Sequence, residues 1–136
     1  MSSQNVLLLE QAKGPLVVAD APIPKPGPGQ ISVKVIGAAL NAIDWKIQAF
    51  DLIVKKYPAI LGSDIAGDVE EIGEGVQGFS KGDKGFWNHS FRLDEYCADI
   101  CWPISFCQGF FVNELGGFQQ YALNPAELVG KVSYLQ

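Results

Sequence analysis

The motif most suggestive of chemistry is a glycine-rich stretch, Gly73-Glu74-Gly75-Val76-Gln77-Gly78. It spells G-x-G-x-x-G, the pattern of turns that hold the pyrophosphate of a dinucleotide. That role requires a helix to begin at the last glycine, because the helix N–H groups and dipole face the phosphates. Residues 79–84 instead contain turn formers and no helical period. We therefore interpret the stretch as a turn between strands, without a nucleotide site.

Three cysteines and a histidine are the other candidates for metal or redox chemistry. Cys97, Cys101 and Cys107 are spaced C-x3-C-x5-C, and His89 lies upstream of them. A structural zinc site needs four soft ligands, and the chain has no fourth cysteine. We interpret the cysteines as free thiols, with recruitment of His89 to a zinc site as a less favoured alternative.

These residues must be positioned by short strands and turns. Residues that favour strands cluster between turn formers in six segments: 6–10, 15–20, 31–36, 64–76, 118–123 and 128–132. The Ala12-Lys13-Gly14 turn predicts an opening hairpin, and the proline-rich residues 22–29 predict an extended connector. Glycines within 64–76 predict a sharp bend or bulge. Many short strands with little helix indicate a mainly β protein, a small barrel or sandwich.

One short helix is expected over residues 41–52. Ile43, Ile47 and Phe50 follow one another at spacings of four and three, as on one face of a helix. Asp44 lies where a side chain can cap the first turn.

Length, composition and charge exclude several classes of protein. The 136 residues fit one domain, and 48% hydrophobic with 18% charged residues is typical of a globular chain. The net charge is −5 and the lysines are scattered, which argues against nucleic-acid binding. No apolar run reaches the roughly 20 residues of a membrane span, and the N-terminus lacks a signal peptide. We expect a cytoplasmic protein with neither a nucleic-acid nor a membrane partner.

Four ordered segments resemble the N-terminal domain of the medium-chain dehydrogenases/reductases: residues 40–46, 57–64, 67–84 and 117–122. The resemblance covers most of residues 5–86 and 116–132. It implies a single domain over residues 1–136 with the fold of a GroES-like, partly open β-barrel with one or two short helices. In that family a Rossmann domain ordinarily follows, with a nicotinamide dinucleotide in the cleft between the two domains.

The same resemblance predicts that a catalytic zinc is absent. Alcohol-oxidising relatives hold zinc with a cysteine and a histidine-glutamate pair, and the matching positions here are Asn41, Ser63 and Asp64. Only Asp64 offers a usual zinc ligand, so the chain resembles the zinc-independent quinone-reductase and enoyl-reductase branch.

The resemblance also implies the site residues. Asn41 and Asp44 are expected on the floor of the cleft near the nicotinamide, and Ser63 and Asp64 are expected to line it. Lys46 is the candidate catalytic residue, because its ammonium could stabilise enolate charge on the substrate oxygen. The alternative is that Asp44 only caps the helix and Lys46 is solvated.

Tyr57 is expected either to flank the substrate or to serve in packing. Ser63 is not expected to act as a nucleophile, because only the distant His89 could serve as its base.

The aromatic- and cysteine-rich residues 86–115 do not fit the resemblance. The expected strand after residue 84 is weakened by Gly85-Phe86-Trp87. The segment is a substrate-binding lobe, a self-association surface, or sequence foreign to the ancestral fold.

Taken together, the sequence predicts a truncated substrate-binding domain of a zinc-independent, nicotinamide-dependent oxidoreductase that is inactive alone. No cofactor is expected on the isolated chain, whereas relatives would use NADPH or NADH to reduce a small α,β-unsaturated carbonyl. The expected partner is a second copy in a homodimer or a Rossmann-type domain in trans. The alternative is a non-enzymatic binding or self-associating module built on the same barrel.

Overall fold

Strand-forming segments dominate the architecture of the chain, as its sequence predicts. The computed structural model describes residues 2–52, 54, 56–88, 113 and 115–132. Within these residues the secondary structure consists of the following elements in chain order: β1 (Ser3–Leu9), β2 (Leu16–Pro22), β3 (Gln30–Ala39), α1 (Ala42–Phe50), β4 (Ala59–Ile60), β5 (Asp64–Ile72), β6 (Lys84–Asn88), β7 (Tyr121–Pro125), a short 3-10 helix (Ala126–Leu128) and β8 (Gly130–Lys131). The mainly β fold with one short α-helix is confirmed.

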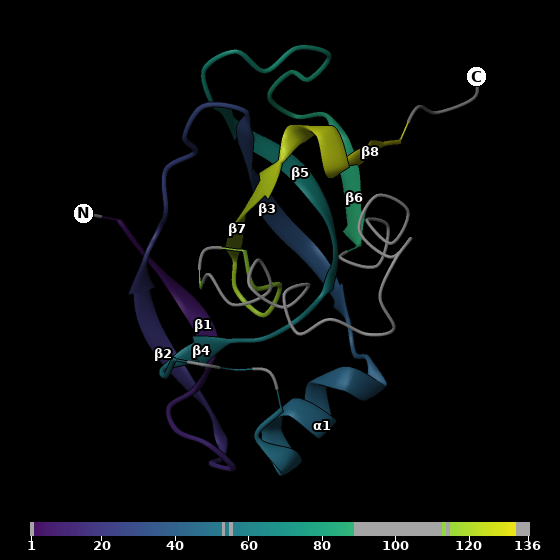
Figure 1. The fold of residues 1–136 in the computed structure, drawn as a ribbon. Helices are drawn as coiled ribbons and strands as arrows, with labels where there is room; N and C mark the ends of the chain where they lie inside the picture. The colour runs from purple at the N-terminus through teal and green to yellow at the C-terminus, as the bar shows by residue number, and fades with distance from the viewer. Residues whose placement is uncertain (1, 53, 55, 89–112, 114, 133–136) are drawn as a thin grey trace.

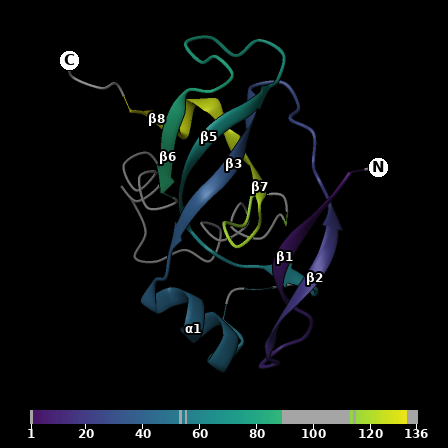
Figure 2. The same ribbon diagram turned by 180° about the vertical axis from the view of Figure 1, so that it is seen from behind.

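The strands form two antiparallel sheets. The smaller has the order β2-β1-β4 and the larger β7-β3-β5-β6-β8. The opening hairpin is confirmed, because β1 and β2 pair from Ser3 and Pro22 to Leu9 and Leu16. Both views place α1 at one end of the larger sheet and the loop that follows β5 at the other (Figure 1 and Figure 2). The open arrangement fits a partly open barrel.

The bend predicted within residues 64–76 lies in the pairing of β3 with β5. The register shifts twice, once between Ser32 and Val33 and once between Val35 and Gly37. At Gly67 the two backbones come so close that an added Cβ would lie 2.1 Å from the carbonyl oxygen of Lys34. The strand itself ends at Ile72 instead of residue 76, because the next residues form the glycine turn.

The G-x-G-x-x-G stretch forms the predicted turn between β5 and β6. Gly75 and Gly78 have φ of 78° and 83°, a left-handed backbone that glycine adopts without steric cost. The N–H of Gly73 donates to the carbonyl of Gln30, which ties the turn to β3. No helix follows it before β6 begins at Lys84.

The expectation that Gly85-Phe86-Trp87 weakens the next strand is wrong. These residues lie in β6, where Gly85 pairs with Gly67 and Trp87 pairs with Ile65. Alternation explains the outcome, since Trp87 is buried in the core while Phe86 is exposed on the other face. Residues 89–112, which include all three cysteines and His89, lie outside the described residues.

Two hydrophobic clusters stabilise the fold. The first is formed mainly by residues of the larger sheet, and its buried members are Ile31, Val33, Ile65, Val69, Trp87, Ala122 and Val129. The second joins α1 to the smaller sheet, and its buried members are Leu9, Ile47, Val54, Ala59 and Leu61. Helix α1 is therefore fixed by Ile47, as its spacing predicts. Neither helix in the described part of the chain is long and apolar enough to cross a membrane.

Candidate functional site

Four polar side chains meet where α1 and β5 begin, and we call Asn41, Asp44, Ser63 and Asp64 the polar cluster. The side-chain Nδ2 of Asn41 donates to Ser63 Oγ at 3.1 Å and to Asp64 Oδ2 at 3.0 Å. Pairing of Ala39 with Asp64 at the end of the β3–β5 ladder brings Asn41 beside the start of β5. Because a carboxylate only accepts hydrogen bonds, this geometry orients the Asn41 amide with its nitrogen inward.

Asp44 secures the first turn of α1 from within the polar cluster. Its Oδ2 accepts the backbone N–H of Asn41 at 2.7 Å, so the predicted capping role is confirmed. The residue is only 8% exposed. Burial raises the pKa of Asp44 above its ordinary value and the Asp64 carboxylate acts in the same direction, while N–H groups of Asn41 and Gly62 oppose them.

Ser63 and Asp64 directly follow Leu61 and Gly62, whose backbone bonds to the segment before β7. The sequence did not predict this contact. Gly62 has φ of 98°, and a Cβ there would lie 2.7 Å from the ring of Phe118. The N–H of Gly117 donates to the carbonyl of Gly62, and the N–H of Phe118 donates to that of Leu61. These hydrogen bonds therefore fix the segment that carries Ser63 to the segment before β7.

One oxygen of the polar cluster has no hydrogen bond. Asp64 Oδ1 is buried and finds no partner within the described part of the chain. Ser63 is buried as well, at 7% exposed. In the same part of the chain, no group of three or more His, Cys, Asp and Glu side chains is placed to hold a metal ion.

Lys46 lies outside the polar cluster, on the exposed surface of α1. Its Nζ is 5.9 Å from the centroid of the Trp45 ring, within the range of a cation–π contact. No carboxylate of the described residues forms an ion pair with it. Among the described residues, Lys46 is thus a cation without a counter-ion, next to an aromatic ring.

Tyr57 also lies apart from the polar cluster, at the other end of α1. Its hydroxyl donates to Asp51 Oδ1 at 2.5 Å, and Asp51 is the residue that ends the helix. Burial and the Asp51 carboxylate raise the pKa of Tyr57 to about 12. The packing alternative for Tyr57 has support, because its side chain also contacts the cluster around Ile47. Sequence patterns gave no signal for Asp51 as its partner.

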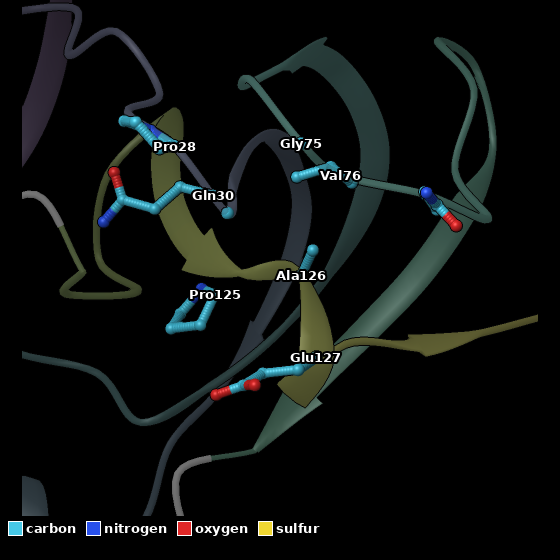
Figure 3. A pocket seen from close by; sticks show the side chains of 9 residues that line it. Pro28, Gln30, Gly75, Val76, Pro125, Ala126 and Glu127 are labelled. Atoms are coloured by element: carbon cyan, nitrogen blue, oxygen red, sulfur yellow. The ribbon is translucent and has the colours of Figure 1, made fainter.

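A hollow of about 500 Å³ opens at the far end of β5 from the polar cluster (Figure 3). Its lining combines the end of the proline-rich connector with the start of β3, the glycine turn, and the end of β7 with the 3-10 helix. The residues are Pro28, Gly29, Gln30, Gly75, Val76, Gln77, Pro125, Ala126 and Glu127. Glu127 is its one titratable group, so the hollow offers little for catalysis.

Comparison with known proteins identifies relatives that are much longer than this chain. Dehydrogenase orsE of Emericella nidulans is 40% identical over 84 residues, which are 62% of this chain and 24% of that protein. The chloroplastic quinone-oxidoreductase QR1 of Triphysaria versicolor is 40% identical over 68 residues, 48% of this chain and 21% of that protein. The chain thus spans about a quarter or less of the length of either relative.

Solved structures share the whole fold. A cobalt- and zinc-bound thermostable alcohol dehydrogenase from Pyrobaculum aerophilum superposes with a TM-score of 0.75 at 26% identity, covering 98% of this chain and 42% of its own. The alcohol dehydrogenase rspB of Escherichia coli CFT073, complexed with its cofactor NADH, gives 0.71 at 26% identity, covering 98% and 39%. Residues 27–134 match the alcohol dehydrogenase GroES-like domain. Most of the chain is covered by that match, and the chain belongs to the alcohol dehydrogenase GroES-like domain family of the medium-chain dehydrogenases/reductases.

Proposed function

We propose that this chain forms the substrate-binding side of a nicotinamide-dependent reductase that acts without a catalytic zinc. The observation that carries the proposal is the hydrogen bonding of Asn41 to both Ser63 and Asp64. It gathers the three positions that the family resemblance assigns to the zinc ligands, and it fills them with an amide, a hydroxyl and one carboxylate.

The donor chemistry of these three side chains does not fit zinc. A catalytic zinc takes about three protein ligands from thiolate, imidazole and carboxylate, with water as the fourth. Asp64 is the one such group among the three, and its Oδ2 already accepts from Asn41. The solved structure from Pyrobaculum aerophilum is cobalt- and zinc-bound, so a protein that shares this fold can hold metal ions, and the side chains present decide whether it does.

The proposed reaction is hydride transfer to the activated double bond of an enoyl or quinone-like carbonyl compound. Similarity to a quinone-oxidoreductase supports this substrate class. A nicotinamide supplies the hydride when it is bound, and NADH in the rspB structure supports that choice of cofactor. The polar cluster would orient the nicotinamide ribose and the substrate through its amide and carboxylate oxygens.

Lys46 is the proposed electrostatic catalyst. Hydride addition leaves negative charge on the carbonyl oxygen of the substrate, and an ammonium near that oxygen stabilises the transition state. Lys46 is exposed and has no counter-ion within the part of the chain that the structure describes, which supports an available charge for a substrate.

The cofactor is proposed to be held elsewhere, because no helix follows the glycine turn to face a pyrophosphate. We propose that a Rossmann-type domain supplies the nicotinamide and that residues 1–136 alone do not turn over substrate. Titration of the purified chain with NADPH and NADH, followed by nicotinamide fluorescence, tests this directly. The expected result is no binding at micromolar concentrations, and micromolar binding would contradict the proposal.

Activity is tested in a fusion of this chain to the nucleotide-binding domain of a matched quinone oxidoreductase. The fusion is expected to oxidise NADPH or NADH in the presence of 1,4-benzoquinone, and Lys46→Met is expected to lower kcat. Lys34→Met is the matched control, since Lys34 is an exposed lysine on β3. Equal turnover of the Lys46→Met fusion and the parent would remove Lys46 from the mechanism.

Zinc content gives an independent test. The native chain is expected to bind no stoichiometric zinc, whereas a variant combining Asn41→Cys, Ser63→His and Asp64→Glu restores the family's ligand types and is expected to bind one ion. Metal analysis of both proteins after dialysis measures the difference. One zinc per native chain would overturn the zinc-independent assignment.

A second candidate function is a binding or self-associating module, favoured by exposed apolar side chains on β3 and along α1. These are Ile36, Leu40, Trp45, Phe50 and Leu52. Clustered exposed apolar surface is typical of interaction sites. Sedimentation of the native chain and of Leu40→Asp over a range of concentrations separates the alternatives, since a homodimer requires association that the variant loses.

A further inference from the structure

The ammonium of Lys46 lies beside an aromatic pair on α1. Neighbouring positions i and i+1 on a helix do not face each other, so Lys46 would ordinarily project about 100° around α1 from Trp45. Its Nζ nevertheless lies 5.9 Å from the centroid of the Trp45 ring. The lysine side chain is therefore bent back toward its neighbour instead of extending into solvent.

The Trp45 ring is itself held by a second aromatic residue. Phe50 packs against it with ring centroids 5.8 Å apart and an interplanar angle of 57°, a tilted contact of the kind that aromatic pairs prefer. Phe50 is the last residue of α1, and the next residue, Asp51, donates its N–H to Ile47 and accepts the hydroxyl of Tyr57. The end of the helix that carries Phe50 is thus fixed from both sides.

Core packing does not explain this arrangement. Trp45 is 53% exposed and Phe50 is 56% exposed, so burial contributes little to their placement. Trp45 and Lys46 are both exposed and directly follow Asp44, the buried member of the polar cluster on α1. The contact with Trp45 therefore restricts where the Lys46 ammonium can lie on the surface of α1.

We propose that Trp45, supported by Phe50, is a positioning residue that restricts the Lys46 ammonium to the surface of α1 beside the Trp45 ring. The proposal rests on the proposed function, in which Lys46 meets the charge that develops on a carbonyl oxygen. Trp45 acts only through Lys46. Its loss leaves the charge in place but lets it move away from the substrate.

Nuclear magnetic resonance of the full chain, labelled with carbon-13 at the lysine side chains, tests the contact itself. The ring current of Trp45 is expected to shift the Lys46 ε-CH2 protons upfield of those of Lys34, with Lys46→Met identifying the signal. Trp45→Leu is expected to abolish the shift, Trp45→Phe to retain part of it, and Phe50→Leu to reduce it. Because Trp45 is exposed, these variants should fold, which circular dichroism verifies. Coincident Lys46 and Lys34 signals in the native chain would overturn the proposal.

The consequence for catalysis is measured in the fusion with 1,4-benzoquinone. A cation–π contact at an exposed site corresponds to about a two- to fivefold effect. Trp45→Leu is therefore expected to lower kcat by about that factor with little change in KM, and Trp45→Phe to recover most of the loss. An unchanged kcat in Trp45→Leu, with Lys46→Met impaired, would overturn the positioning role alone. If Lys46→Met is also unimpaired while the ring-current shift persists, the failure lies in the proposed function.

Discussion

The side-chain nitrogen of Asn41 lies 3.0 Å from Oδ2 of Asp64 and joins the residue before α1 to the first residue of β5. The same nitrogen lies 3.1 Å from Ser63 Oγ. One amide therefore connects two elements that are more than 20 residues apart in the chain. The contribution of this amide to the free energy of unfolding can be measured, as can the effects of the contacts made by Asp44, Tyr57 and Gly67.

Asn41→Ala removes the donor that serves both partners. Asp64 Oδ1 already lacks a hydrogen bond, so the variant leaves the whole carboxylate poorly satisfied in a partly buried site. The free energy of unfolding should fall by about 1–2 kcal/mol. Urea unfolding measures the change, and Asn5→Ala on the exposed side of β1 is the control. Indistinguishable midpoints for the two variants would show that the Asn41 contacts do not stabilise the fold.

Asp44 links stability to pH. The pKa of Asp44 is raised in the folded chain, so the folded state holds the carboxyl proton more tightly than the unfolded state does. Protonation of Asp44 therefore stabilises the fold, and this stabilisation is fully present below the ordinary pKa of 3.8. The stability of the native chain relative to Asp44→Asn should therefore decline as pH rises from about 4 through the raised pKa. Asn retains an acceptor for the N–H of Asn41, so this comparison isolates the charge.

Asp44→Ala separates capping from ionisation. It removes the acceptor at the start of α1 and should lower the free energy of unfolding, relative to Asp44→Asn, by about 0.5–2 kcal/mol at every pH. Thermal unfolding of the native chain, Asp44→Asn and Asp44→Ala measures both effects. The pH is varied from about 4 to about 7, from the ordinary pKa of a carboxyl group upward. A native chain that gains stability over Asp44→Asn as pH rises would contradict the raised pKa.

Asp51→Asn should lower the pKa of Tyr57 from about 12. Burial is the largest cause of the shift and remains in the variant, so the pKa should stay above the ordinary value of 10.0. In the native chain this contact stabilises the fold below pH 10 and is lost as pH rises toward 12. Phenolate absorbance during alkaline titration measures the shift, with Tyr57→Phe identifying the transition. An unchanged titration in Asp51→Asn would mean that the carboxylate does not contribute.

Gly67→Ala tests the close approach of β3 and β5. The new Cβ would lie 2.1 Å from a backbone oxygen, and neither strand can retreat because each is paired on both sides. The expected loss of stability is about 3 kcal/mol or more. Gly37→Ala on β3 is the matched control, since nothing lies within 4 Å of its added Cβ. Similar stability of both variants would contradict the packing of this ladder.

Local patterns predicted most of the scaffold because they act over a few residues. Alternation placed β3, turn formers placed the β1–β2 hairpin, and the spacing of Ile43 and Ile47 placed α1. Local patterns do not predict the strand at Lys84–Asn88 well, because a glycine at position 85 disfavours a strand when only its neighbours are considered. Its pairing with Gly67 and the burial of Trp87 outweigh that local preference.

The sequence alone determined the family, the mainly β barrel and the residue types available at Asn41, Ser63 and Asp64, because ordered motifs and donor chemistry can be read without coordinates. The capping of α1 by Asp44 is likewise a local property. Only the tertiary structure decided which side chains meet. The Asn41 contacts depend on the β3–β5 register, and the Tyr57 contact depends on where α1 ends. The position of the Lys46 ammonium depends on its contact with the Trp45 ring. These contacts arise from long-range pairing and side-chain packing, which no spacing along the chain encodes.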